Sequence, residues 1–221
     1  MAARFLCGSV FACTVLAVSC LAAKNSPADP QHLLAEADRI SWLKNWNRAE
    51  PLYAQAEKLF ASRGDYRNAL YARVNRWRGE MGSTAPQLIS QRISEVLQDP
   101  LVESDPPLKL RCLVVKGDAD LDVNSALAER DWTEALAVAK SLNQQDWMSR
   151  AAGELGIIAF LQGDSGAAMI KVGAALKHAQ TAHDLGAEYR YRTLLATGLT
   201  EFGAAEQALL MYDKALSLIH I

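Results

Sequence analysis

The chain has 221 residues, of which 50% are hydrophobic and 22% are charged, and its formal net charge is −2. This is the composition of a globular protein and excludes wholesale disorder. Acidic and basic residues alternate along the chain without the basic excess typical of a dedicated nucleic-acid binder, so we expect no nucleic-acid partner.

Residues 1–23 have the layout of an export signal. Arg4 supplies a short positive region, and an uncharged apolar run follows from Phe5 to Val18. This order is typical of a secretory signal peptide and is too short for a stable membrane-spanning helix, although an uncleaved anchor is the alternative. We therefore expect an exported bacterial protein, periplasmic or anchored in the envelope, that meets the membrane only through this leader or a lipid.

The end of the leader offers two processing sites. The run Leu16-Ala17-Val18-Ser19-Cys20 resembles a bacterial lipobox, in which the Cys20 thiol is lipidated and the residue becomes the new N-terminus. Cleavage after Ala22 or Ala23 by an ordinary signal peptidase fits the sequence equally well. In both cases the polar residues 24–31 would form a tether between the processing site and the folded part.

Cysteine usage follows from the leader. Cys7, Cys13 and Cys20 all lie in it, so Cys112 is the single cysteine of the mature region. One cysteine cannot form an internal disulfide, even in an oxidising compartment. The apolar helical surroundings of Cys112 predict a buried structural thiol rather than a nucleophile.

From residue 31 onward, apolar residues recur at the three- and four-residue spacing of helices, without a convincing strand pattern. Turn signals such as Gly64-Asp65 and Gly163-Asp164 interrupt the pattern at fairly regular intervals, which predicts short helices paired into hairpins. We expect two blocks of hairpins, 31–98 and 108–215. The proline-rich stretch 99–107 cannot be helical throughout and should separate them.

Alanine positions repeat along both blocks. Ala168 follows Ala135 by about 33 residues, and Ala208 follows Ala168 by about 40. Ala49 lies about 86 residues before Ala135, which leaves room for two units of about 43 residues. We expect Trp132 to open the helix that contains Ala135, and segments 66–81 and 86–97 to pair as a hairpin upstream.

The last two units carry a family resemblance. Each has leucine followed by glycine or alanine in its first helix, glycine at the turn and alanines in its second helix: Leu155-Gly156, Gly163, Ala168 and Ala175, then Leu195-Ala196, Gly203, Ala208, Tyr212 and Ala215-Leu216. This pattern resembles the tetratricopeptide repeat, with degenerate copies extending the likeness over residues 31–216. The resemblance implies an all-α solenoid of about five antiparallel hairpins that binds a protein or peptide.

In tetratricopeptide arrays the first helix of each hairpin lines a concave groove. Carried over to the last two units, this implies a groove formed by Arg150, Glu154, Ile157, Arg190, Thr197 and Glu201. These side chains suit an extended peptide, although pairing of the same charges within the array would look identical in the sequence.

A second candidate surface surrounds Trp77. Arg73, Arg76 and Arg78 recur around it at helical spacing. The simpler interpretation is an amphipathic helix whose arginines face water. The alternative is a basic patch for an acidic peptide or a carboxylate, because the forked guanidinium binds carboxylates with two parallel hydrogen bonds.

Little in the sequence predicts catalysis, a metal or a cofactor. His178 and His183 are five residues apart, whereas two ligands on one helix face are three or four apart. We find no glycine-rich phosphate loop, no paired-cysteine zinc spacing and no nucleophile elbow. Residues 117–122 resemble a calcium loop only superficially, and we expect a solvated helix face there. We therefore predict that this chain is not an enzyme and holds no small-molecule cofactor.

The final hexapeptide, residues 216–221, is what the codons CTG-TCT-CTT-ATA-CAC-ATC encode, and these resemble a transposon-derived sequencing adapter. We expect it to be an adapter-derived artefact of a metagenomic reading frame, with a natural chain that continues further. A coincidental amphipathic helix end is the alternative. The array also stops without the polar cap with which solenoids usually end.

Three functions remain in competition. The leading hypothesis is a non-catalytic scaffold that binds a protein or peptide partner in the cell envelope. The second is the sensor or adaptor region of a larger enzyme, because such arrays behind signal peptides resemble those that precede CHAT-like protease, kinase or cyclase domains. The third is a structural module that forms homo-oligomers.

Overall fold

The structure, a computed structural model, describes residues 29–218, and these are helical with short turns. The predicted all-α class is confirmed. The leader, the lipidation candidate Cys20, most of the tether and residues 219–221 lie outside the described residues. The elements are α1 (Pro30–Trp42), α2 (Trp46–Ser62), α3 (Tyr66–Gly79), η1 (Glu80–Gly82), α4 (Pro86–Val96), α5 (Pro100–Glu103), α6 (Pro106–Leu121), α7 (Ser125–Ser141), α8 (Gln145–Leu161), α9 (Ser165–Ala182), α10 (Leu185–Glu201) and α11 (Ala205–Leu216).

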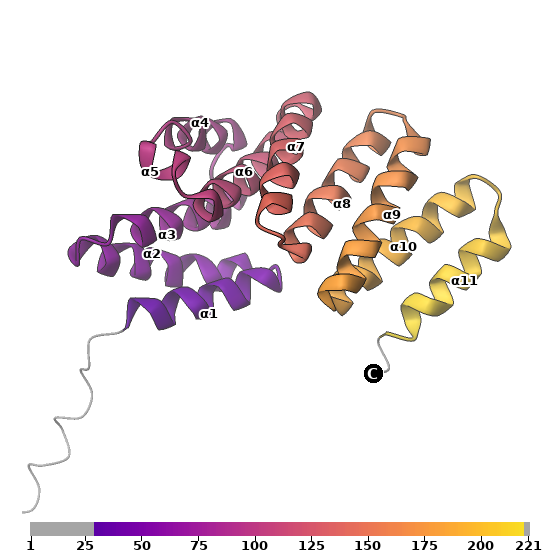
Figure 1. The fold of residues 1–221 in the computed structure, drawn as a ribbon, viewed down its shortest axis with the longest axis horizontal. Coiled ribbons are helices and arrows are strands. Elements are labelled where there is room, and N and C mark those ends of the chain that lie inside the picture. Colours follow the sequence, from indigo (N-terminus) through magenta and orange to yellow (C-terminus); the bar gives the residue numbers. More distant parts are fainter. Residues whose placement is uncertain (1–28, 219–221) are drawn as a thin grey trace, which may run out of the picture.

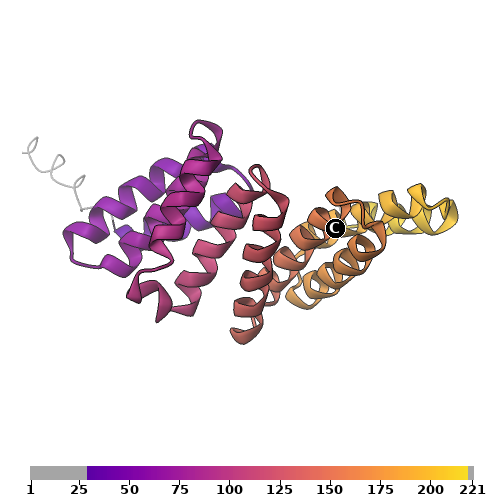
Figure 2. The ribbon, with the colours of Figure 1, turned by 90° about the horizontal axis from the view of Figure 1, so that it is seen from above.

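Consecutive helices pack side by side and stack into an arch. Helices α1 and α2, α6 and α7, α8 and α9, and α10 and α11 form hairpins joined by short turns (Figure 1). Each hairpin also packs on its neighbour, through α2 with α3, α7 with α8 and α9 with α10. Turned by 90°, the array is elongated, with α1 and α11 at opposite ends (Figure 2). This is the predicted solenoid of antiparallel hairpins.

The turns are built by residues that tolerate left-handed backbone and by acidic caps. Gly64, Gly163 and Gly203 adopt φ values of 74°, 84° and 74°, where a Cβ would be strained. The following Asp65 and Asp164 accept hydrogen bonds from the first turns of α3 and α9 through their side chains. A Gly-Asp pair therefore ends one helix and begins the next, which is why it marked the turns in the sequence.

Small residues set how closely helices approach. A Cβ on Gly117 of α6 would lie 2.7 Å from Nε1 of Trp132, a fully buried side chain of α7. The expectation that Trp132 opens its helix is wrong, because α7 begins at Ser125. The Asn124 side chain caps that start by accepting a hydrogen bond from the backbone N–H of Ala126 at 2.8 Å. Trp132 therefore lies in mid-helix, at the centre of the α6–α7 contact.

The middle of the chain is the least regular part. Helix α4 packs chiefly on α6 and only sparsely on α3, with which we expected it to pair. The proline-rich stretch 99–107 contains the short helix α5, and Asp105 caps the start of α6 by accepting from the Leu108 N–H at 2.9 Å. The three helices α3, α4 and α6 share one apolar core that includes Val74, Ile89 and Cys112.

Cys112 is completely buried, as the sequence predicted, and burial raises the pKa of its thiol to about 12. No helix between residues 29 and 218 combines the length and the apolar character that crossing a membrane would demand.

Candidate partner-binding surface

An arginine occupies the same position in three successive first helices. Arg111, Arg150 and Arg190 are each the sixth residue of α6, α8 and α10, and we call them the arginine ladder. Sequence reasoning found Arg150 and Arg190 but missed Arg111. Its signal was present, because the three arginines recur at about the same period as the repeat itself.

Each arginine of the ladder reaches back to a polar side chain of the preceding first helix. Arg111 donates from Nε to Oδ1 of Asn75 on α3. The Arg150 NH2 group lies 2.8 Å from Oδ2 of Asp118 on α6. The Arg190 NH2 group lies 3.2 Å from Oε1 of Glu154 on α8. The alternative that these charges pair within the array is therefore what the structure contains.

The ladder becomes more exposed toward the C-terminal end. Arg111 is 6% exposed, the Arg150 side chain is 11% exposed, and the Arg190 side chain is 38% exposed. The same residue type at the same helical position is therefore a core residue in α6 and a surface residue in α10.

We call the side of the arch formed by the first helices of the hairpins its inner face. Around Arg111 this face is filled by side chains of the molecule itself. Its guanidinium carbon lies 5.8 Å from the ring centroid of Tyr71 and 5.1 Å from that of Trp147. The Trp147 ring in turn makes an edge contact with Trp42 at the end of α1, at 5.4 Å between centroids. Tyr71 also donates to the Asp38 carboxylate of α1 at 3.2 Å. Helices α1 and α8 therefore meet across this face.

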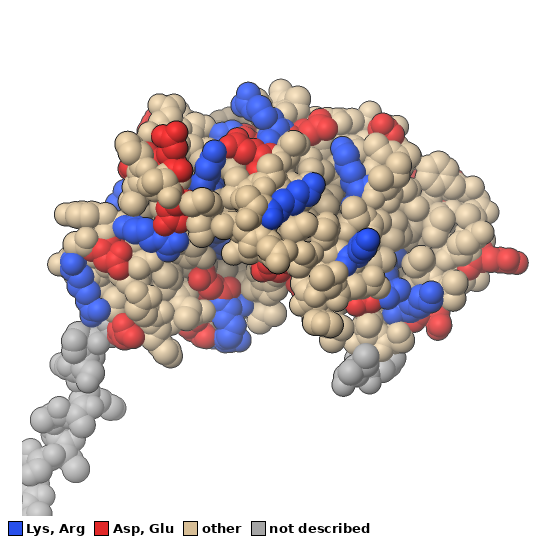
Figure 3. Space-filling view, viewed as in Figure 1, with Lys and Arg blue, Asp and Glu red and all other residues tan. Residues whose placement is uncertain are grey.

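The predicted basic patch is largely neutralised by intramolecular ion pairs. Arg73 and Arg76 both bind the Glu57 carboxylate, at 2.7 and 2.9 Å. Arg78 lies 2.6 Å from Asp118 and stacks over the Trp46 ring at 4.8 Å. Figure 3 likewise shows basic and acidic side chains interspersed over the face in view. These three arginines are partnered with carboxylates rather than free for an acidic ligand.

The expected solvated face at residues 117–122 is wrong at its two central acids. The Asp118 side chain is 10% exposed and Asp120 is 0% exposed. Burial opposes ionisation of Asp118, but Arg150 and Arg78 outweigh it and hold the pKa of this carboxyl below its usual range. The two acids can be buried because basic partners from α3, α6 and α8 compensate their charges. Across residues 29–218 no cluster of potential metal ligands forms.

Asp120 belongs to a second buried cluster that ties α6 to α7. Lys116 Nζ lies 2.5 Å from Asp120 Oδ2 and 2.8 Å from Asp131 Oδ2. One ammonium serves two carboxylates, so the cluster carries an excess of negative charge. Burial, together with the neighbouring Asp120, raises the pKa of Asp131 to about 6.

Five of the six predicted groove residues line a surface between α8 and α10, which we call the α8–α10 surface, whereas Glu154 is buried and lines neither of its pockets. A pocket of about 390 Å³ lies at its N-terminal end, where Arg150 and Arg190 meet Lys44 of the α1–α2 turn. We call this the charged pocket, because Asp146 and Asp184 line it as well. In the middle, Tyr191 packs directly against Gly153, which has no side chain to obstruct it.

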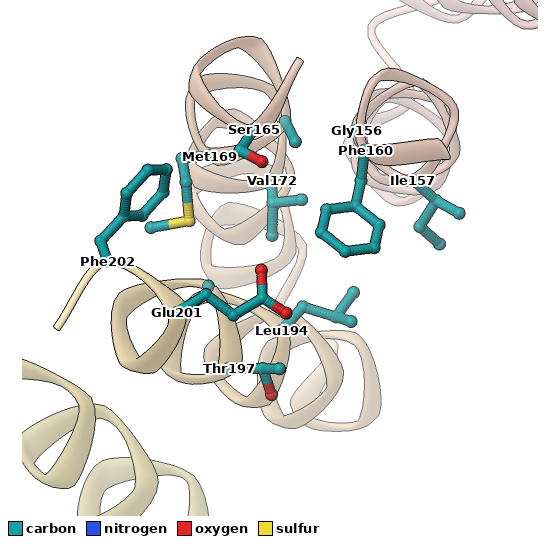
Figure 4. A pocket seen from close by; sticks show the side chains of 12 residues that line it. Gly156, Ile157, Phe160, Ser165, Met169, Val172, Leu194, Thr197, Glu201 and Phe202 are labelled. Carbon is teal, nitrogen blue, oxygen red and sulfur yellow. The ribbon is translucent and has the colours of Figure 1, made fainter. Parts of the chain in front are cut away.

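A second pocket of about 260 Å³, the apolar pocket, lies at the other end of the α8–α10 surface. Three of the predicted residues line it, namely Ile157, Thr197 and Glu201. Helix α9 forms one wall, and most of the side chains around the space are apolar, with Ser165, Thr197 and Glu201 as the polar ones (Figure 4). Sequence reasoning did not find this wall, because Met169 and Val172 of α9 have the spacing of ordinary core residues.

The two histidines lie apart from these pockets. His178 Nδ1 is 2.8 Å from Oε1 of Gln145, which links α9 to the start of α8. His183 ends α9 in a left-handed conformation with φ of 55°. Neither lines the charged pocket or the apolar pocket. His178 joins two helices and His183 ends one.

Comparison with known proteins agrees with this architecture. No protein-family model matches the sequence, and no curated protein matches it. Among solved structures, a Rap protein complexed with competence and sporulation factor is similar at a TM-score of 0.72 and 15% identity. The match covers 86% of this chain and 53% of that one, so this chain spans about half the length of the Rap protein.

Two other similar structures are matched over most of their length. A thermophilic TPR protein of Thermus thermophilus has a TM-score of 0.58 and 18% identity, with 86% of this chain and 91% of that one covered. MamA has a TM-score of 0.53 and 14% identity, with 83% and 94% covered. At such identities the likeness shows the fold alone. The chain is thus a helical solenoid of the tetratricopeptide-repeat type.

Proposed function

We propose that this chain is a non-catalytic scaffold that binds a peptide or a protein segment on the α8–α10 surface. The observation that carries this proposal is the pair of pockets at the two ends of that surface. Elsewhere on the inner face the ladder and its aromatic neighbours fill the space with the molecule's own side chains.

The dimensions suit a short extended segment. Arg190 and Glu201 mark the two ends of the surface on α10, and a helix rises about 1.5 Å per residue, so they are separated by about 16 Å. An extended chain covers about 3.3 Å per residue, so roughly five residues would span both pockets. Recognition of an extended peptide by a row of pockets is a common mode of protein interaction.

One similar structure supports the idea by analogy, since the Rap protein was solved in complex with competence and sporulation factor. The analogy is one of fold and is weaker than the pockets themselves. It favours a peptide or protein partner over a structural role alone.

Selection of random dodecapeptides displayed on phage against the immobilised protein tests the proposal. We expect enriched peptides whose affinity, measured by fluorescence anisotropy, falls at least about tenfold when Thr197→Trp obstructs the α8–α10 surface. The matched control is Ile170→Ser, because Ile170 is 76% exposed and lines neither pocket. Absence of enriched peptides, or equal losses in both variants, would contradict a peptide-binding role for this surface.

We also propose that the protein is exported to the bacterial envelope. The support is the sequence of residues 1–23, with Arg4 before an apolar run. Fused to a phosphatase that is active only outside the cytoplasm, the intact leader should give activity, and Leu16→Arg should abolish it. Cys20→Ser distinguishes the two processing routes, since it blocks maturation only if Cys20 is lipidated. An inactive fusion with the intact leader would refute export.

A further inference from the structure

We propose that the apolar pocket anchors a partner segment in which a large apolar side chain stands beside a lysine or arginine. This inference rests on the proposed function, since it names the chemistry of the segment that the α8–α10 surface would bind. It concerns one end of that surface only, and the charged pocket is not needed for it.

The volume and the lining of the pocket set the first requirement. Phe160, Met169, Val172 and Leu194 surround a space of about 260 Å³. Small-molecule sites usually measure about 300–1,000 Å³, so this space is better matched to one or two protein side chains than to a cofactor. Transfer of a leucine, methionine or phenylalanine side chain from water into such a lining is favourable in proportion to the apolar area buried.

The rim of the pocket is unusually apolar for a surface. Phe160 is 50% exposed and Phe202 is 60% exposed. Phe160 and Phe202 contribute to the pocket from α8 and from the residue that follows α10. Isolated exposed apolar residues need no explanation, whereas a cluster around a concavity is typical of an interaction site.

A single carboxylate supplies the second requirement. Glu201 is the only charged residue among those that line the pocket, and its side chain extends over the space toward Val172 and Leu194 (Figure 4). Within residues 29–218 no lysine or arginine forms an ion pair with it. A carboxylate beside apolar walls attracts a cation, and the methylene groups of lysine or arginine can lie along the same walls.

The charges on the partner segment therefore follow from the pocket. An acidic neighbour to the anchoring side chain would face Glu201 and be repelled, whereas a basic neighbour would be attracted. Since like-charge contacts at an interface disfavour the wrong partner, Glu201 would act as a selector for basic segments.

The displayed dodecapeptides provide the probe. From wild-type protein we expect peptides with a large apolar residue that has lysine or arginine within two positions. Selection on Glu201→Lys should keep the apolar residue and replace the basic neighbour by aspartate or glutamate. A wild-type peptide should bind Glu201→Lys at least about tenfold more weakly by anisotropy. Phe160→Ser should weaken the same peptide comparably, and Ile170→Ser should leave it unchanged, since Ile170 lies outside the pocket.

The outcomes separate this inference from the proposed function. If peptides bind and are blocked by Thr197→Trp but show no apolar and basic preference, or ignore Glu201→Lys, the inference fails and the proposed function stands. If no peptide is enriched, the proposed function fails with it. If the protein dimerises in sedimentation velocity and Phe160→Ser makes it monomeric, a second copy occupies the pocket and the peptide partner is refuted. Near-ultraviolet circular dichroism of each variant verifies that the fold is intact.

Discussion

The inner face of this solenoid differs between its two halves. Around Arg111, where α1, α3, α6 and the start of α8 meet, it is filled by a polar and aromatic layer in which the Arg111 guanidinium stacks on Tyr71 and Trp147, and Asp38 accepts hydrogen bonds. Between α8 and α10 two pockets remain open to solvent. The helices are of one type and the ladder arginines are at one position, so repeat architecture alone does not make a binding surface.

The packing across the arch accounts for the difference. The end of α1 reaches α8 through the edge contact of Trp42 with Trp147, and this contact encloses Arg111. Arg190 lies one hairpin beyond that enclosure and is consequently 38% exposed along its side chain. A polar residue on a first helix thus stabilises the core where the arch closes over it, and remains available to a ligand where the arch does not.

The largest effect should come from the enclosed end of the ladder. Arg111→Met would leave the Asn75 carbonyl buried without its donor, and Asn75 is 0% exposed. We expect the free energy of unfolding to fall by about 3 kcal/mol, since an unsatisfied buried group and a lost buried guanidinium both contribute. Urea denaturation followed by circular dichroism measures this. A loss no larger than that of Arg190→Met would break the distinction between the two halves.

Substitution of Arg150, in the middle of the ladder, should cause an intermediate loss of stability that depends on pH. Arg150→Met leaves Asp118 with Arg78 alone, and we expect a cost of about 2 kcal/mol at neutral pH. The folded-state pKa of Asp118 is depressed, so its contribution is present above the unfolded pKa of about 3.9 and is lost as pH falls through the folded value. Removing Arg150 should raise that folded pKa toward the unfolded value, so the variant should lose less stability than wild type on acidification, and the difference in stability between the two should shrink at low pH.

Thermal melts between neutral and strongly acidic pH test this point, with Arg92→Met as the control because Arg92 lies 3.7 Å from Glu80 and does not pair with Asp118. Parallel pH profiles for wild type and Arg150→Met would show that Arg150 does not set the ionisation of Asp118.

The opposite pH dependence of stability is expected at the buried acidic pair of α6 and α7, Asp120 and Asp131. Asp131 has its pKa raised to about 6, so its contribution is full below the unfolded value of about 3.9 and is lost as pH rises through the folded value. Asp131→Asn removes the surplus charge and keeps an acceptor for Lys116. Relative to wild type it should gain stability on the order of 1 kcal/mol between acidic and neutral pH. A constant difference in melting temperature across that interval would contradict the shared-ammonium arrangement.

The sequence predicted the class of fold because its signals are local. Gly163 and Asp164 must end and begin helices in nearly any context, and Ala168 with Ala175 must face a close neighbour. The packing of α4 on α6 could not be foreseen, because it depends on how the proline-rich stretch 99–107 turns the chain.

For the candidate site, the family resemblance implied Arg150, Glu154 and Ile157 as groove residues. In the structure Arg150 lines the charged pocket and Ile157 lines the apolar pocket, whereas Glu154 is buried. Whether a charge is paired depends on residues that are remote in the chain, such as Asp118 for Arg150 and Glu57 for Arg73. The apolar pocket likewise needs three helices to form, and no single one of them carries its signature.

The smallest change in stability should come from the open end of the ladder, and it should be accompanied by a change in binding. Arg190→Met removes the ion pair with Glu154, in which the guanidinium is well solvated. We therefore expect the free energy of unfolding to fall by about 1 kcal/mol or less. Arg190 also lines the charged pocket, so peptides that span the α8–α10 surface should bind this variant more weakly. Arg190→Lys, which keeps the charge, should restore part of that affinity. If binding is unchanged in Arg190→Met while Glu201→Lys abolishes it, the apolar pocket is the whole binding site. The charged pocket at the other end of the α8–α10 surface would then play no part in binding.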